Sequence, residues 1–212
     1  MKRFIGKMIV IKKYILLLVM FVVSGAIGSY ILFQKELAEA PSVQEGVVSS
    51  SPSPETQGTV KREKNRVVVN LSNRGLTEFP KEILSNTGIT TLILSNNNIK
   101  TLPSEIGRLT NLRELYLDNN QLEGALVGEV RHMSKLEILD AHNNNMTGIP
   151  AEIGQLKHLV TLNLADNMID TMPDEIRNIS ENLKTLDLSN NTYSQETLLR
   201  IEAMLQSTNV IY

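Results

Sequence analysis

The chain has 212 residues, a formal net charge of −2 and no cysteine. The absence of cysteine excludes disulfide bonds, thiolate zinc sites and a lipid anchor on a cysteine. The small net charge conceals an asymmetry, because residues 1–33 carry five basic and no acidic side chains, whereas residues 64–212 carry 13 basic and 18 acidic ones. An acidic C-terminal part argues against nucleic acid as its partner.

The N-terminal segment has the pattern of a membrane anchor. Five basic residues lie within residues 1–13, and residues 14–33 then run for 20 positions without a charge. At about 1.5 Å per residue this run is long enough to cross a hydrocarbon core of roughly 30 Å. The basic cluster on its N-terminal side predicts a short cytoplasmic stub, a single-pass cell-membrane protein and an extracytoplasmic remainder.

A cleavable signal peptide is the alternative interpretation of the same segment. Residues 15–23 would be its apolar region, and the small residues Ser24, Gly25 and Ala26 would form the cleavage site, so that the mature chain would be secreted. The anchor is favoured because the apolar run continues through residues 27–33, which a signal peptide does not need.

Residues 34–63 have the composition of a linker. They are rich in Ser, Pro, Glu and Gln, and they contain no aromatic residue and no periodic apolar stripe. Such a segment buries too little apolar surface to offset the entropy of ordering, so we expect a disordered linker. Residues 64–212 are left as the folded domain.

A pattern of about 23 residues is repeated through this domain. Its clearest copy, residues 89–109, reads L-x-x-L-x-L-x-x-N-x-L-x-x-L-P-x-x-I-x-x-L when isoleucine is allowed at leucine positions. The copies begin at Arg66, Ile89, Leu112, Leu136, Leu159 and Leu183. The asparagine position holds Asn97, Asn120, Asn144, Asn167 and Asn191, with Arg74 in the first copy. The steps of 23 or 24 residues predict a repeat architecture of about six copies.

This pattern resembles the leucine-rich repeat. The L-x-x-L-P-x-x-I half is similar to the repeats of Ras-pathway scaffolds and plant intracellular proteins, a subtype also common in bacteria. In the third copy, residues 122–130 are one residue longer and resemble the form found in plant receptor ectodomains. The resemblance implies an α/β solenoid with a parallel concave sheet, and it implies protein binding as the usual role of such a module.

Burial explains why the copies should stack. The alternating leucines of one strand, such as Leu115 and Leu117, cannot be buried by a single copy and need neighbours on both sides. The asparagine can satisfy backbone groups of neighbouring coils, and the L-P-x-x-I half suits a short helical or 3₁₀ return on the convex side. After the last copy, Ser194 is the expected N-cap of a helix that caps the solenoid.

Residues on the concave face are the expected binding residues, because their side chains alternate with the inward leucines. Alignment of the six copies gives four columns of such residues. The first column is Val68, Thr91, Glu114, Ile138, Thr161 and Thr185, and the second is Asn70, Ile93, Tyr116, Asp140, Asn163 and Asp187. The third is Ser72, Ser95, Asp118, His142, Ala165 and Ser189, and the fourth is Asn73, Asn96, Asn119, Asn143, Asp166 and Asn190.

These columns contain carboxylates but no lysine or arginine, so the expected partner is a protein with a basic surface. Tyr116, the single aromatic residue in the columns, is the expected anchor, with Ile93 and Ile138 on flanking strands. The predicted partner-binding residues are Ile93, Glu114, Tyr116, Asp118, Ile138, Asp140, His142, Asn163, Asp166 and Asp187. The alternative is that the acids only keep the sheet soluble and that Tyr116 is a neutral surface residue.

Catalysis and cofactor binding are not expected. Asp118 and His142 share a column on adjacent strands and are expected to form a surface hydrogen bond, but no strained Ser or Cys nucleophile motif accompanies them. A cation site of Asp118, Asp140, His142 and Asp166 is disfavoured, because adjacent parallel strands rarely close a ligand shell. We therefore predict no enzyme, metal, cofactor or small-molecule substrate.

The sequence thus predicts a membrane-anchored protein that binds a partner protein with the concave face of its repeats. Two other roles remain open. The repeats would serve as a structural or adhesive spacer without a specific ligand, or residues 14–33 would be the main contact within a membrane assembly.

Overall fold

A computed structural model describes residues 59–63 and 66–212. The predicted stub, membrane anchor and most of the predicted linker lie outside the described residues. Within the described residues, no helix is long and apolar enough to cross a membrane.

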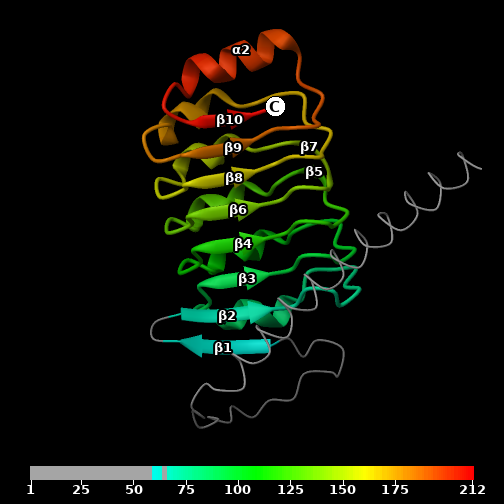
Figure 1. The fold of residues 1–212 in the computed structure, drawn as a ribbon. Coiled ribbons are helices and arrows are strands. Elements are labelled where there is room, and N and C mark those ends of the chain that lie inside the picture. The colour runs from blue at the N-terminus through cyan, green and yellow to red at the C-terminus, as the bar shows by residue number, and fades with distance from the viewer. Residues whose placement is uncertain (1–58, 64–65) are drawn as a thin grey trace, which may run out of the picture. The chain divides into compact units, whose positions relative to one another are not determined.

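Eight of the described strands form one sheet in the order β1-β2-β3-β4-β6-β8-β9-β10 (Figure 1). Its strands are β1 (Thr59–Glu63), β2 (Arg66–Asn70), β3 (Thr91–Ile93), β4 (Glu114–Tyr116), β6 (Ile138–Asp140), β8 (Thr161–Asn163), β9 (Thr185–Asp187) and β10 (Asn209–Ile211). The strands from β2 to β10 are parallel, and each of the six predicted copies contributes one of them, from β2 to β9. The predicted parallel sheet is therefore confirmed.

Strand β1 differs from the sequence prediction, which placed residues 59–63 in a disordered linker. These residues pair antiparallel with β2, with Thr59 opposite Asn70 and Val60 opposite Val69. The reason is that the first strand of a stack presents a row of unpaired backbone groups, which an adjacent segment can satisfy. The linker prediction was wrong for these five residues.

The return segments on the other side of the sheet are short 3₁₀ helices, as the spacing predicted. They are η2 (Lys81–Ser85), η3 (Ser104–Arg108), η4 (Gly128–His132), η5 (Ala151–Gln155) and η6 (Asp174–Ile179). A proline precedes four of them at the N-cap, where its missing N–H costs no hydrogen bond. The third copy has Val127 there, and a second, two-stranded sheet precedes its helix, with β5 (Glu123–Ala125) paired to β7 (Asn145–Gly148).

Between the sheet and the 3₁₀ helices lies a continuous core, built from the leucines and isoleucines of the pattern. The helices approach closely enough to need glycine at two positions. A Cβ added to Gly154 would lie 2.2 Å from the backbone oxygen of Glu175, and one added to Gly107 would lie 2.9 Å from that of Glu129. Neighbouring return segments therefore pack backbone against backbone.

The asparagine of each copy joins two coils, as predicted. The Asn97 amide Nδ2 donates to the carbonyl of Leu94 at 2.8 Å and to that of Leu71, in the preceding coil, at 3.0 Å. Its Oδ1 accepts the backbone N–H groups of Arg74 and Leu76, also in the preceding coil. Equivalent donations to both coils are made by Asn120, Asn144, Asn167 and Asn191. Buried backbone groups that no strand pairs are thus satisfied by side chains.

At the C-terminal end of the domain, helix α2 (Gln195–Met204) follows the last copy. The predicted N-cap is confirmed, because Ser194 Oγ accepts the N–H of Thr197 at 3.1 Å. Ile201 and Leu205 are buried in the core. The chain then returns as β10, which the sequence analysis did not predict, and pairs parallel with β9.

Candidate functional site

The register of the sheet aligns the first two predicted columns on the concave face. Tyr116 lies opposite Ile93 on one side and Asp140 on the other, and Asp140 is followed by Asn163 and Asp187. We call the row Asn70, Ile93, Tyr116, Asp140, Asn163 and Asp187 column two. Neighbouring members are about 4.8 Å apart, the usual spacing of paired strands.

Nine of the ten predicted partner-binding residues are half-buried. The tenth, Asp166, is exposed. Ile138 faces Glu114 rather than Tyr116, so it lies diagonally across from the tyrosine. The first column is mostly β-branched, and strand propensity alone accounts for Ile138 there.

The fourth column has a backbone role that the sequence analysis did not recognise. Its six residues all have left-handed backbone conformations, with φ between 53° and 58°. Asparagine and aspartate tolerate this conformation better than other residues with a side chain. Asp166 belongs to this column, and its Oδ1 accepts from Asn190 Nδ2 at 2.8 Å. The turn therefore accounts for Asp166 without a ligand.

Column two has a second backbone role. In four of its six members, side-chain Oδ1 accepts the N–H of the residue two positions later, at 2.9–3.2 Å. These members are Asn70, Asp140, Asn163 and Asp187. Such Asx turns bend the chain at the end of the strand, which is why short polar residues recur there. The remaining members, Ile93 and Tyr116, have no carbonyl or carboxylate oxygen that can form this turn.

Tyr116 and Ile93 are therefore the column-two residues that the backbone does not require. They are neighbours in register on β4 and β3, and both are half-buried. Burial raises the pKa of the Tyr116 phenol, and the carboxylates of Glu114 and Asp140 raise it further, so the ring is neutral. The pair forms an apolar surface with acidic neighbours.

The Glu114 carboxylate is less available to a partner protein than the sequence suggested. Its carboxylate forms an ion pair with Arg66, which reaches it from β2 across β3. Thr91 Oγ1 donates to the other carboxylate oxygen at 3.2 Å. Alignment of columns could not reveal this pair, because Arg66 lies outside the columns and 48 residues away in the chain.

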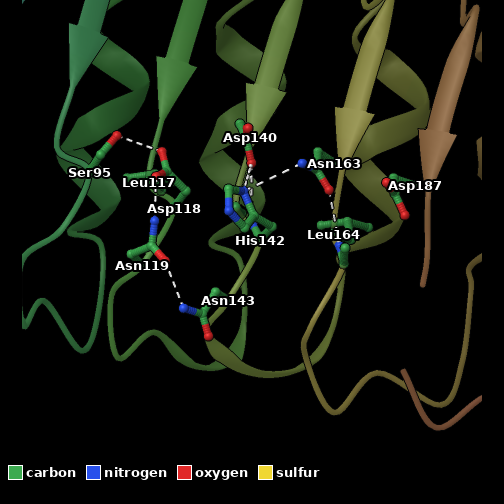
Figure 2. Close-up of polar contacts among 12 residues, drawn as sticks. Ser95, Leu117, Asp118, Asn119, Asp140, His142, Asn143, Asn163, Leu164 and Asp187 are labelled. Atoms are coloured by element: carbon green, nitrogen blue, oxygen red, sulfur yellow. Dashed lines mark hydrogen bonds and ion pairs between the residues drawn. The ribbon is translucent and has the colours of Figure 1, made fainter. Parts of the chain in front are cut away.

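The predicted hydrogen bond between Asp118 and His142 is wrong. Figure 2 shows His142 beside Asp140 instead, with its Nδ1 2.7 Å from Asp140 Oδ1. Asp118 turns toward the preceding strand, where it accepts from Ser95 Oγ at 2.5 Å, and also from Asn119 Nδ2 at 2.7 Å. The Asx turn explains the difference, because it holds the Asp140 carboxylate over the residue that carries the imidazole.

His142 is the histidine of this cluster, and its pKa is raised by its acidic neighbours. Partial burial lowers its pKa, but the hydrogen bond to Asp140 and the charges of Asp140, Asp118 and Asp166 outweigh burial and raise the pKa overall. The short contact requires a proton on Nδ1, since a carboxylate has no proton to donate. Protonation of Nε2 then adds one positive charge to an otherwise acidic surface.

Strand β10 adds a residue to the concave face that the sequence analysis missed. Ile211 pairs with Asp187, so it continues column two by one strand, and it is 39% exposed. The apolar residues Val210 and Ile211 were the available signal. They were overlooked because they stand outside the repeat.

The described residues contain no group of three or more His, Cys, Asp or Glu side chains arranged to hold a metal. A hollow of about 220 Å³ lies between the second sheet and the preceding coil, away from the concave columns. Leu102, Leu122 and Met146 are among its lining residues.

Comparisons with known proteins agree with this geometry. A family model described as "Leucine Rich repeats (2 copies)" matches residues 87–125 and 134–178. A leucine-rich repeat protein of Leptospira interrogans is similar in structure, with 29% identity and a TM-score of 0.53 over 65% of this chain and 40% of that one. The ectodomain of the Arabidopsis receptor kinase HAESA, solved in complex with a peptide hormone, has 28% identity and a TM-score of 0.62 over 76% of this chain and 28% of the receptor.

An internalin from Listeria monocytogenes has 25% identity and a TM-score of 0.56 over 68% of this chain and 58% of the internalin. The chain thus spans less than two thirds of each of these proteins. No curated protein sequence matches it.

Proposed function

We propose that the chain, two parts of which match a leucine-rich repeat family model, recognises a partner protein with its concave face, centred on Tyr116. One observation carries the proposal. Four of the six column-two residues have side chains that the Asx turns require, whereas Ile93 and Tyr116 replace them with apolar surface. A half-buried tyrosine beside an isoleucine gives contact area at low entropic cost, as binding hot spots do.

The charges around this apolar pair favour a basic partner. Asp118, Asp140 and Asp187 accept hydrogen bonds from hydroxyl, amide, imidazole or backbone groups, and among the described residues none of the three contacts a lysine or arginine at ion-pair distance. Their negative charges therefore remain available to a partner. Complementary charge speeds association and disfavours partners of the wrong sign.

The plant relative supports a peptide or protein as the ligand, since HAESA was solved in complex with a peptide hormone. This chain spans 28% of that receptor, so the likeness supports the kind of ligand and not its identity.

We further propose that residues 14–33 anchor the protein in the cell membrane and that the repeats lie outside. The uncharged run and the basic residues before it support this topology. Protease added to intact cells should degrade the repeat domain, whereas a protected domain would overturn the topology. Mass spectrometry of the mature N-terminus distinguishes an anchor from a cleaved signal peptide.

The binding role is tested by crosslinked affinity capture from native membranes with the full chain as bait. The Ile93→Ala, Tyr116→Ala double variant should lose the partner, because truncating a hot spot costs about 2 kcal/mol or more. Met168→Ala is the matched control, since Met168 is an apolar residue that is 49% exposed outside the columns. Identical protein lists from all three baits would contradict concave-face recognition and favour the spacer or the membrane helix.

A further inference from the structure

The concave surface has apolar side chains at two places in the same row, the half-buried Tyr116 and the exposed Ile211. The register of the sheet runs from Tyr116 through Asp140, Asn163 and Asp187 to Ile211. Ile211 is 39% exposed, although isoleucine is among the residues most often buried. The row therefore has an apolar residue at each end and three polar residues between them.

The distance between Tyr116 and Ile211 limits which peptide can contact both residues. Four strand-to-strand steps of about 4.8 Å separate Tyr116 from Ile211, which gives about 19 Å. An extended peptide rises about 3.3 Å per residue, so it covers this distance in about six residues. Six is an even number, and side chains of an extended chain alternate between faces. Residues i and i+6 of such a peptide therefore face the sheet together.

The intervening positions of the peptide meet the carboxylates. Residues i+2 and i+4 also face the sheet, about 7 and 13 Å from the first anchor, and Asp140 and Asp187 lie about 5 and 14 Å along the row. In each aspartate, Oδ1 accepts the backbone N–H of the Asx turn, and Oδ2 makes no hydrogen bond within the part of the chain that the structure describes. Flexible basic side chains can reach these oxygens.

We propose that the row from Tyr116 to Ile211 binds an extended segment of a partner protein with the pattern apolar-x-basic-x-basic-x-apolar. This proposal rests on the concave-face function proposed above and specifies the ligand of that site. A helix fits less well, because its diameter of about 10 Å would cover the neighbouring columns too. Beside Asn163 and Asp187, those columns present Thr161, Thr185, Ser189 and the buried Ala165, so they offer a helix no exposed apolar anchor there.

Two labelled peptides of equal composition test the spacing. The first, LSRSRSL, places its leucines six residues apart. The second, LSRSRLS, places them five apart, so that one leucine points away from the sheet. Fluorescence anisotropy with the solubilised full chain should give an affinity about ten-fold higher for the first peptide, the difference expected from one lost anchor. Equal affinities would overturn the proposed pattern.

Three variants test the row itself. Ile211→Ala should weaken LSRSRSL about ten-fold and leave LSRSRLS within two-fold, because only the first peptide uses that anchor. Asp187→Asn retains the Oδ1 of the turn and removes the charge, so it should weaken both peptides and reduce the salt dependence of binding. Met168→Ala should change neither. Circular dichroism melts of each variant confirm that the fold is retained.

The outcomes separate this inference from the proposed function. Partner capture that needs Tyr116 but tolerates Ile211→Ala and Asp187→Asn, with no preference between the peptides, would overturn the extended-segment pattern alone. Partner capture that tolerates Ile93→Ala with Tyr116→Ala would overturn the concave-face function, and this inference with it.

Discussion

Replacement of Asn120 by alanine tests whether side-chain amides hold the coils together. Asn120 Nδ2 donates to the carbonyls of Leu94 and Leu117 at 3.0 Å, and its Oδ1 accepts the N–H of Ile99 at 3.0 Å. Each carbonyl keeps a second donor, the asparagine of an adjacent coil, whereas the Ile99 N–H loses its partner. An orphaned buried N–H costs about 1–3 kcal/mol, and two weakened carbonyl bonds add roughly 0.5 kcal/mol each, so we expect a loss near 3 kcal/mol.

Urea unfolding of the full chain measures this loss. With a slope of about 2 kcal/mol per molar urea, Asn120→Ala should lower the unfolding midpoint by about 1.5 M. Asn98→Ala is the matched control, because Asn98 is exposed and accepts one surface bond from Gln121, so its cost should stay below about 0.5 kcal/mol. Equal midpoints for the two variants would refute the role assigned to the buried amides.

Three further predictions concern packing, pH and the C-terminal helix. Gly154→Ala should destabilise the domain by about 2–3 kcal/mol in thermal melts, because the new Cβ would meet the Glu175 carbonyl. In an NMR titration, His142 should show a pKa above the 6.5 of a free histidine, and His142→Gln should remove the associated pH dependence. Folding raises that pKa, so protonated His142 stabilises the folded domain at low pH, and this stabilisation is lost as pH rises through the pKa of the folded state. Affinity for a basic peptide should follow the opposite trend, because it falls as His142 becomes charged. Arg200→Ala removes an ion pair to Asp174 in η6, so amides of α2 should exchange faster with solvent while those of β4 stay protected.

The repeating part of the fold was predictable because one physical requirement recurs in every copy. Inward leucines such as Leu115 and Leu117 must be buried, and the spacing of each copy fixes where the next strand lies. Asn97 was assigned correctly for a related reason, since the backbone groups of a coil need partners wherever no strand supplies them. The register of the strands, the concave columns and the positions of the return segments followed from the repeat of 23 or 24 residues.

The two end strands could not be predicted in this way. β1 and β10 obtain their hydrogen bonds from an existing edge of the sheet, so neither needs the leucine pattern that identifies a repeat. As a consequence, Ile211 lies on the concave face although the alignment of the repeat copies does not include it.

Side-chain pairing within the candidate site was also beyond the alignment. Columns place Asp118 next to His142, but the local Asx turn brings Asp140 to the imidazole instead. Arg66 reaches Glu114 across an intervening strand because its side chain is long and flexible. The left-handed turn at Asp166 and its equivalents cannot be read from an alignment of columns, and this turn explains the aspartate without a ligand.

Site-specific photocrosslinking in native membranes tests the central claim most directly. A benzophenone side chain would replace Tyr116 in the full chain, and a second chain would carry it in place of Met168. Our account predicts a partner adduct from position 116 and none from position 168, with Asp187→Asn weakening the adduct. The same adducts from both positions, or an adduct from position 168 alone, would contradict recognition by the concave face.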